Sequence, residues 1–95
     1  MTIGLLATLK IQPGKGPDFE TAFADLAKIV KAEEPGNLQY DLFRAKEADT
    51  YVVYEQYADQ AAVEIHGKSD SAKAGMGKMG GFLAGRPTLQ FLDKV

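Results

Sequence analysis

The chain has 95 residues, of which 45% are hydrophobic and 25% charged, and this balance is typical of a small folded protein rather than a disordered segment. Eleven basic and 13 acidic residues give a net charge of −2, which argues against nucleic acid or an anionic membrane as a partner. The chain has no cysteine and one histidine, so disulfides, a cysteine nucleophile and a thiolate metal site are excluded, and we expect no metal site.

The first part of the chain predicts a strand followed by a helix. Residues 2–11 alternate between apolar and mostly small or polar side chains, the two-residue period of a strand. Pro17 at the first helical position begins a helix whose apolar side chains recur every three or four residues as far as Val30. The turn at 34–36, Glu-Pro-Gly, ends that helix.

A hairpin is predicted next. Residues 38–45 and 50–57 are strand-like, and the polar tip 46–49 between them has the length of a hairpin loop. If the strands pair directly across that loop, Tyr40 lies opposite Glu55. One face of the hairpin then carries Leu38, Tyr40, Leu42, Tyr51, Val53, Glu55 and Tyr57.

The last part of the chain predicts two short helices and a final strand. Asp59 is a good N-cap for a helix over 60–66, and Ser69 can begin a second helix that runs towards Gly80. Residues 88–95 alternate again and predict a strand.

This order of elements predicts a ferredoxin-like α+β fold, with a four-stranded antiparallel sheet and the helices on one face, as one domain over residues 1–95. The opposite face would be too apolar to stay in water, so we expect a homodimer through packed sheet faces. The N-terminus has no basic leader and no apolar run is long enough for a membrane span, so we expect a cytoplasmic protein. The apolar positions on the face of the sheet opposite the helices are Leu6, Phe43, Val52, Tyr54 and Leu92.

His66 is the first candidate for chemistry. It follows Ala62 and Val63 by four and three residues, which places it on the inward side of its helix. Imidazole exchanges protons readily near neutral pH, so a histidine that faces a cavity is a candidate base or acid. The alternative is a histidine that only forms a hydrogen bond within the core.

Glu55 and Tyr40 are the next candidates. A carboxylate within an apolar strand is costly to bury unless it is paired, and His66 is a possible partner that Glu55 would orient. Alternatively, a shift of one residue in the register would expose Glu55. Tyr40, opposite Glu55, either binds an oxygenated ligand or is an ordinary core residue.

Five further residues are candidates for substrate binding. Tyr51 shares the inward face of the hairpin, and Met76 and Phe82 suit the wall of a pocket or its core. Asn37 and Arg86 stand at strand starts, where they either bind a polar ligand edge or have only a capping role.

Two segments of the chain resemble the antibiotic biosynthesis monooxygenase domain family, and within it the quinol monooxygenases. They are EPGNLQYDLFRAKEADTYVVYEQYADQAAVEIHGKSD, from Glu34 to Asp70, and LAGRP, from Leu83 to Pro87. The shared marks are the EPG turn, the aromatic hairpin, the YEQY strand, the DQAA helix with its histidine, and the late GRP. Family domains are about this size, so the resemblance covers the chain from end to end.

The resemblance implies a dimeric ferredoxin-like α+β barrel and oxygen chemistry that needs no flavin, heme or metal, because the substrate supplies the electrons. We therefore expect a cofactor-independent monooxygenase that oxidises a quinol or similar polyphenolic aromatic with O2. His66 would accept the proton, Glu55 would orient His66, and Tyr40 would lie near the substrate oxygen. Two alternatives stay open: a small-molecule isomerase of the signalling-dione type on the same fold, and a non-catalytic dimeric binding module.

The heme-degrading branch of the family differs from this chain at three places. It has a tryptophan where His66 stands and a heme-ligating histidine where Met76 stands. It also has an asparagine on the first strand, where this chain has Leu6 and Ala7. These departures argue against heme as a ligand.

Overall fold

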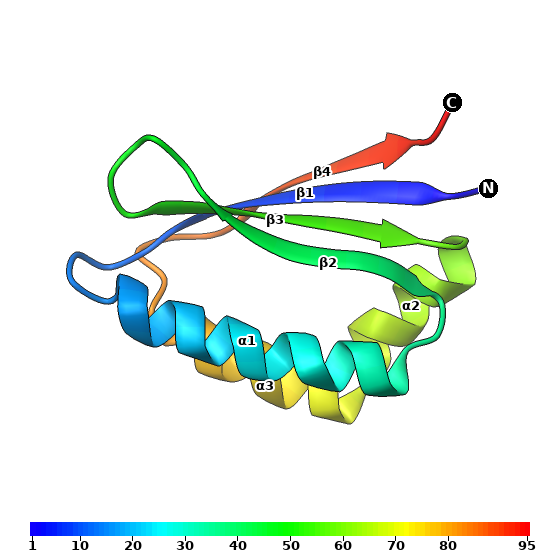
Figure 1. Ribbon diagram of the computed structural model, residues 1–95, viewed down its shortest axis with the longest axis horizontal. Helices are drawn as coiled ribbons and strands as arrows, with labels where there is room; N and C mark the ends of the chain where they lie inside the picture. Colours follow the sequence, from blue (N-terminus) through cyan, green and yellow to red (C-terminus); the bar gives the residue numbers. More distant parts are fainter.

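The computed structural model describes residues 1–95 and contains every element that the sequence predicts. Helix 60–66 extends two residues further than predicted, and the last strand ends two residues earlier. In Figure 1 the helices lie along one face of the sheet and leave its other face bare. The elements are β1 (Ile3–Lys10), α1 (Gly16–Glu33), β2 (Asn37–Arg44), β3 (Thr50–Tyr57), α2 (Gln60–Lys68), α3 (Asp70–Gly80) and β4 (Thr88–Asp93).

The four strands form one antiparallel sheet in the order β2-β3-β1-β4, which confirms the ferredoxin-like α+β fold. The predicted register of the hairpin is also confirmed, because Tyr40 pairs with Glu55. One detail was wrong. The register shifts between Asn37 and Gln39, so Leu38 has no partner on β3 and is exposed, although the alternation had placed it on the helix face.

The core lies between the inner face of the sheet and the helices. Helix α1 presents an apolar stripe to it, and the residues of that stripe are almost fully buried: Phe19, Phe23, Leu26 and Val30. On the sheet side, β1 and β3 contribute alternate residues, because successive side chains of a strand point to opposite faces. The members from these two strands are Ala7, Leu9, Tyr51 and Val53.

The edge strand β4 has no helix beneath it. It pairs only with β1, and all six of its residues are exposed. Leu89 and Phe91 pair with Ala7 and Leu5, so they face the helix side of the sheet, yet they remain 55% and 58% exposed. The inner surface of the sheet is therefore open along this edge.

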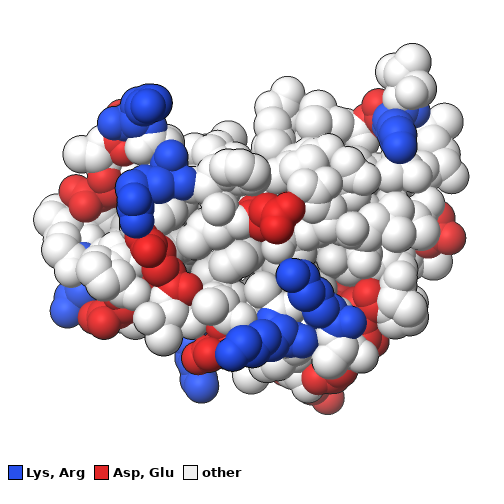
Figure 2. All heavy atoms as spheres, viewed as in Figure 1, with Lys and Arg blue, Asp and Glu red and all other residues white.

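The bare face of the sheet carries the five apolar side chains that the sequence placed there. Leu6, Val52 and Tyr54 are half-buried, while Phe43 and Leu92 are exposed. The side shown in Figure 2 carries most of its charged side chains over the helices and at the hairpin end, and a largely uncharged area lies above them.

No helix is both long enough and apolar enough to cross a membrane. The cytoplasmic location stays a prediction.

The packing of α3 against α1 depends on a glycine. A Cβ atom added at Gly75 would lie 2.7 Å from Leu26 Cδ1 and 3.2 Å from Leu26 Cβ, and Leu26 is fully buried. A methyl group at that position would push the two helices apart or distort Leu26.

We expect Gly75→Ala to lower the free energy of unfolding by about 1 to 3 kcal/mol, because it overpacks the contact between α1 and α3. Gly77, two residues further along the same helix, is exposed and has open space around it. Gly77→Ala should therefore raise the free energy of unfolding by about 0.5 to 1 kcal/mol through helix propensity alone. Urea unfolding of both variants measures the difference, and equal effects of the two substitutions would contradict the packing argument.

Candidate functional site

A cavity of about 420 Å³ lies between the inner face of the sheet and helices α2 and α3. Its size is within the range of pockets that hold small organic ligands. Most of its wall is apolar, and no lysine or arginine lines it. The lining residues are Leu5, Ala7, Leu9, Tyr40, Val53, Glu55, Tyr57, Val63, His66, Gly67, Met76, Met79, Gly80, Leu83, Pro87, Leu89 and Phe91.

His66 reaches this cavity because of how α2 begins. The side chain of Asp59 accepts a hydrogen bond from the backbone N–H of Ala62 over 2.9 Å, which fixes the start of the helix as predicted. Ala62 is buried beneath the helix, and His66, one turn later, turns to the same side. The inward orientation that the spacing predicted for His66 is present in the structure.

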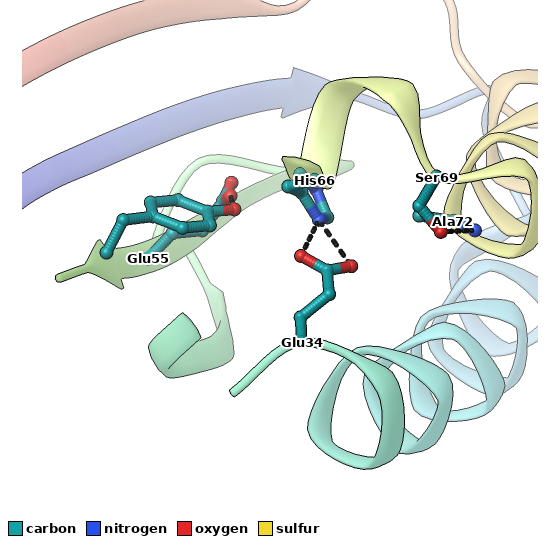
Figure 3. A network of polar contacts seen from close by, with 6 residues as sticks. Glu34, Glu55, His66, Ser69 and Ala72 are labelled. Atoms are coloured by element: carbon teal, nitrogen blue, oxygen red, sulfur yellow. Dashed lines mark hydrogen bonds and ion pairs between the residues drawn. The ribbon is translucent and has the colours of Figure 1, made fainter. Parts of the chain in front are cut away.

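The partner of His66 is Glu34, not Glu55 as predicted. Nδ1 of His66 lies 2.9 Å and 3.0 Å from the two carboxylate oxygens of Glu34, which is the residue just after α1. Figure 3 shows Glu34 reaching up to the imidazole, while Glu55 lies on the neighbouring strand without a bond to it. Glu34 is buried, so the carboxylate and the imidazole shield each other from water.

This contact fixes the chemistry of the imidazole. An ionised carboxylate can only accept hydrogen bonds, so with Glu34 ionised the hydrogen of this contact is on Nδ1 of His66, which donates it to Glu34. In the neutral ring, Nε2 is then the nitrogen with a free electron pair. A carboxylate behind Nδ1 also stabilises the imidazolium that forms when Nε2 takes a proton.

Sequence reasoning interpreted Glu34 only as the end of a helix. The sequence did contain one indication that Glu34 has a partner. A carboxylate at a helix C-terminus is repelled by the negative end of the helix dipole. A residue held in such a position against this repulsion usually has a specific partner. The identity of that partner depends on how α2 crosses the end of α1, and the spacing along the chain does not give this angle.

Glu55 has a different environment. The residue is 5% exposed, and Oε1 accepts a hydrogen bond from the hydroxyl of Tyr57 over 2.5 Å. Tyr57 stands two residues further along β3 and therefore points to the same face. Burial raises the pKa of Glu55, and the hydrogen bond from Tyr57 and the attraction to His66 only partly oppose that shift.

Tyr40 brings a phenol to the same cavity from β2. Its ring stacks on Phe23, with centroids 5.1 Å apart, and the ring of His66 lies edge-on to it with centroids 5.6 Å apart. The hydroxyl makes no hydrogen bond to another residue. Burial, together with the nearby carboxylates of Glu55 and Glu34, raises the pKa of Tyr40, so its hydroxyl keeps its proton and can donate it to a ligand oxygen.

Only one of the five predicted substrate-binding residues, Met76, lines the cavity. Tyr51 shares the inner face of the sheet but lies at the hairpin end, where its hydroxyl donates to Glu20 Oε2 over 2.5 Å. Arg44 bonds the same oxygen over 2.6 Å, which completes a polar cluster that is separate from the cavity. The face of Tyr51 was predicted correctly, and its position along the strand was not.

The other three predicted residues also lie outside the cavity lining. Phe82 packs against the hydrophobic core, and Arg86 is exposed just before β4. Asn37 begins β2, and its Nδ2 atom is buried without a hydrogen-bond partner. Sequence reasoning missed Leu89 and Phe91 as part of the wall, because alternation alone does not show that the edge strand would lack a helix.

No group of three or more histidine, aspartate or glutamate side chains could hold a metal ion.

Comparison with known proteins places this chain in a family. The profile of the family described as antibiotic biosynthesis monooxygenase matches residues 2–78. The chain belongs to the antibiotic biosynthesis monooxygenase family. This confirms the family that the two segments of the sequence resemble, and the quinol branch within it stays a prediction.

Three relatives illustrate the family. The protein named "Putative monooxygenase YcnE" from Bacillus subtilis (strain 168) is 38% identical over 68 residues, which cover 70% of each chain. A crystal structure of a "putative antibiotic biosynthesis monooxygenase" from Caulobacter crescentus CB15 is 48% identical, covers 99% of this chain and 90% of its own, and has a TM-score of 0.95. SnoaB from Streptomyces nogalater, described as a cofactor-independent oxygenase, shares the fold at a TM-score of 0.84 and 15% identity, over 98% of this chain and 92% of its own.

The contact between Glu34 and His66 predicts one dominant tautomer. In mildly alkaline solution, where a free imidazole is neutral and prefers the Nε2-protonated form, we expect His66 to carry its hydrogen on Nδ1. Nitrogen-15 NMR of the imidazole distinguishes the two forms. Glu34→Gln should shift the balance towards the Nε2-protonated form, because the amide binds Nδ1 less strongly. A wild-type ring protonated on Nε2 would contradict the assignment.

Proposed function

We propose that this protein is a cofactor-independent monooxygenase that oxidises a quinol or a similar polyphenolic aromatic with O2. The observation that carries the proposal is the pair formed by Glu34 and His66 at the wall of an apolar cavity. A base backed by a carboxylate is suited to removing a phenolic proton. The family of the chain and the description of SnoaB support the same chemistry.

The proposed reaction begins with proton transfer. Nε2 of His66 takes a phenolic proton from the substrate, and Glu34 stabilises the imidazolium through Nδ1. Tyr40 donates a hydrogen bond to a substrate oxygen and so helps to hold the ring in place. The resulting anion is electron-rich and can pass an electron to O2. The apolar wall limits the access of water to this reactive state.

The charges around the cavity favour an uncharged substrate. Glu55 lines the cavity, Glu34 lies behind His66, and no lysine or arginine lines the wall to balance a negative group on a ligand. A phosphorylated, sulfonated or carboxylated substrate would have to lose its hydration without gaining a cationic partner, which is costly. A neutral aromatic diol meets no such penalty.

We further propose that two copies associate through the bare faces of their sheets. Leu6, Val52 and Tyr54 form the centre of that face on β1 and β3, and Phe43 and Leu92 extend it to the edges. A group of exposed apolar side chains of this kind usually marks an interface. Two identical sheets can cover each other by two-fold symmetry. The cavities lie on the opposite faces and would stay open in such a dimer.

Oxygen consumption tests the proposed activity. We expect the protein to accelerate O2 uptake with 2-methyl-1,4-naphthoquinol, and His66→Gln to reduce the rate by about 10²- to 10⁴-fold, the usual contribution of a general base. The sulfonated naphthoquinol of the same ring size is the control for charge and should react much more slowly. An oxygen electrode measures each rate against the spontaneous oxidation of the quinol.

Two outcomes would overturn the proposal. Turnover of a dione or enol at equal rates with and without O2 would assign the cavity to an isomerase. Ligand binding without any turnover across a panel of quinols, detected only as a rise in melting temperature, would assign it to a binding module.

The state of assembly has its own test. We expect the wild type to sediment as a dimer and Phe43→Asp to sediment as a monomer, because a charge would then be buried in the interface. Ile65→Asp is the matched control, since Ile65 is 57% exposed and Phe43 is 56% exposed, but Ile65 lies on α2 away from the sheet. Loss of the dimer in both variants, or in neither, would contradict the assignment to this face.

A further inference from the structure

The two buried glutamates near the cavity have different partners, and this difference suits them to different roles. Both carboxylate oxygens of Glu34 contact Nδ1 of the His66 imidazole, a ring that can carry a hydrogen on either nitrogen. Glu55 binds the hydroxyl of Tyr57, a neutral donor that reaches only Oε1. The second oxygen of Glu55, Oε2, makes no hydrogen bond to the protein, and Glu55 lines the cavity.

The surroundings of Glu55 offer a negative charge little support. Tyr40 stands opposite it on β2, and the apolar side chain of Leu5 stands opposite it on β1. The other titratable groups around it are Tyr57 on β3, His66 on α2 and Glu34 after α1, which repels a second carboxylate. Burial is the largest effect on its pKa, which is raised.

The proposed oxygenation needs a proton donor at a late step. Attachment of O2 to a ring carbon of the quinol anion gives a peroxide, and His66 can return its proton to the outer oxygen. To reach a hydroxyquinone, this hydroperoxide must then lose water. The C–H bond at that carbon breaks, its electron pair forms the new C=O bond, and the O–O bond breaks with its pair on the leaving oxygen. That oxygen leaves as hydroxide unless an acid protonates it.

We propose that Glu55 is this acid: its carboxyl group donates a proton to the oxygen that leaves as water, while Nε2 of His66 takes the proton from the ring carbon. The inference rests on the proposed function. One quinol and one O2 give one hydroxyquinone and one water. His66 ends the step with one additional proton and Glu55 with one fewer, and solvent restores both when the product leaves. Tyr57 is a positioning residue, because it holds Oε1 and leaves Oε2 for the substrate.

Glu55→Gln tests this role while it keeps the shape of the side chain. The amide oxygen can still accept the hydrogen bond from Tyr57, but the amide has no proton to donate at this step. We expect O2 uptake to continue and the yield of hydroxyquinone per O2 to fall by about tenfold or more, in line with the loss of a general acid. The missing product should appear as quinone and hydrogen peroxide in equal amounts, because that outcome needs no cleavage of the O–O bond.

Glu34→Gln is the matched control, since it makes the same change at the other carboxylate. It should slow O2 uptake, because His66 loses the carboxylate that stabilises its imidazolium, and it should lower the yield of hydroxyquinone per O2 less than Glu55→Gln does, because the carboxyl group that donates the proton is still present. A wild-type yield in Glu55→Gln would overturn the role of Glu55 while the oxygenase activity stands. Absence of O2 uptake in the wild type would overturn the proposed function and this inference with it.

A second measurement needs no substrate. Infrared spectroscopy of the wild type at neutral pH should show the C=O stretch of a protonated carboxyl group that Glu55→Gln lacks. Tyr57→Phe removes a hydrogen bond that lowers the pKa of Glu55, so the band should persist to higher pH in that variant. If Glu55 shows no such band at neutral pH, it is already ionised and cannot act as the acid, and the inference is wrong.

Discussion

The pairing of β2 with β3 is the constraint on which the site depends. In this register Tyr40 and Glu55 face each other on the helix side of the sheet, and Tyr57 follows on the same face. A slip of β2 by one residue against β3 would turn Tyr40 to the bare face and bring Phe43 under the helices, while the pairing of β3 with β1 would keep Glu55 on the helix side. The hairpin therefore determines both surfaces of the sheet at once, the one that carries the cavity and the one that is left without cover.

The features that followed from local periodicity could be predicted from the sequence. The alternation of the hairpin gave its register, and the cap at Asp59 gave the inward phase of His66. Contacts that depend on three-dimensional placement could not be predicted in this way. The hydrogen bond between Glu34 and His66 joins residues 32 positions apart, at the junction of two helices. Tyr51 lies on the right face but at the far end of its strand, because alternation specifies a side and not a distance along the sheet.

The cavity region contains two buried carboxyl groups, and each would destabilise the fold if it had no hydrogen-bond partner. Two buried carboxyl groups in a protein of 95 residues cost free energy of folding, and each is tolerated because a specific partner satisfies part of its hydrogen bonding. The partners differ in kind, an imidazole for Glu34 and a phenol for Glu55. Neighbouring carboxyl groups in unlike surroundings are the usual means by which a protein keeps an acid and a base ready at the same pH.

The open edge at β4 has an evolutionary consequence. The titratable groups of the cavity stand on β2, β3, α2 and the end of α1, whereas Leu89 and Phe91 belong to a strand that pairs only with β1. Substitutions at these two positions alter the shape of the pocket without moving Glu34, His66 or Glu55. Because edge positions are exposed, such changes cost little stability. Selection can therefore vary the shape of the pocket while the titratable groups inside it are inherited unchanged.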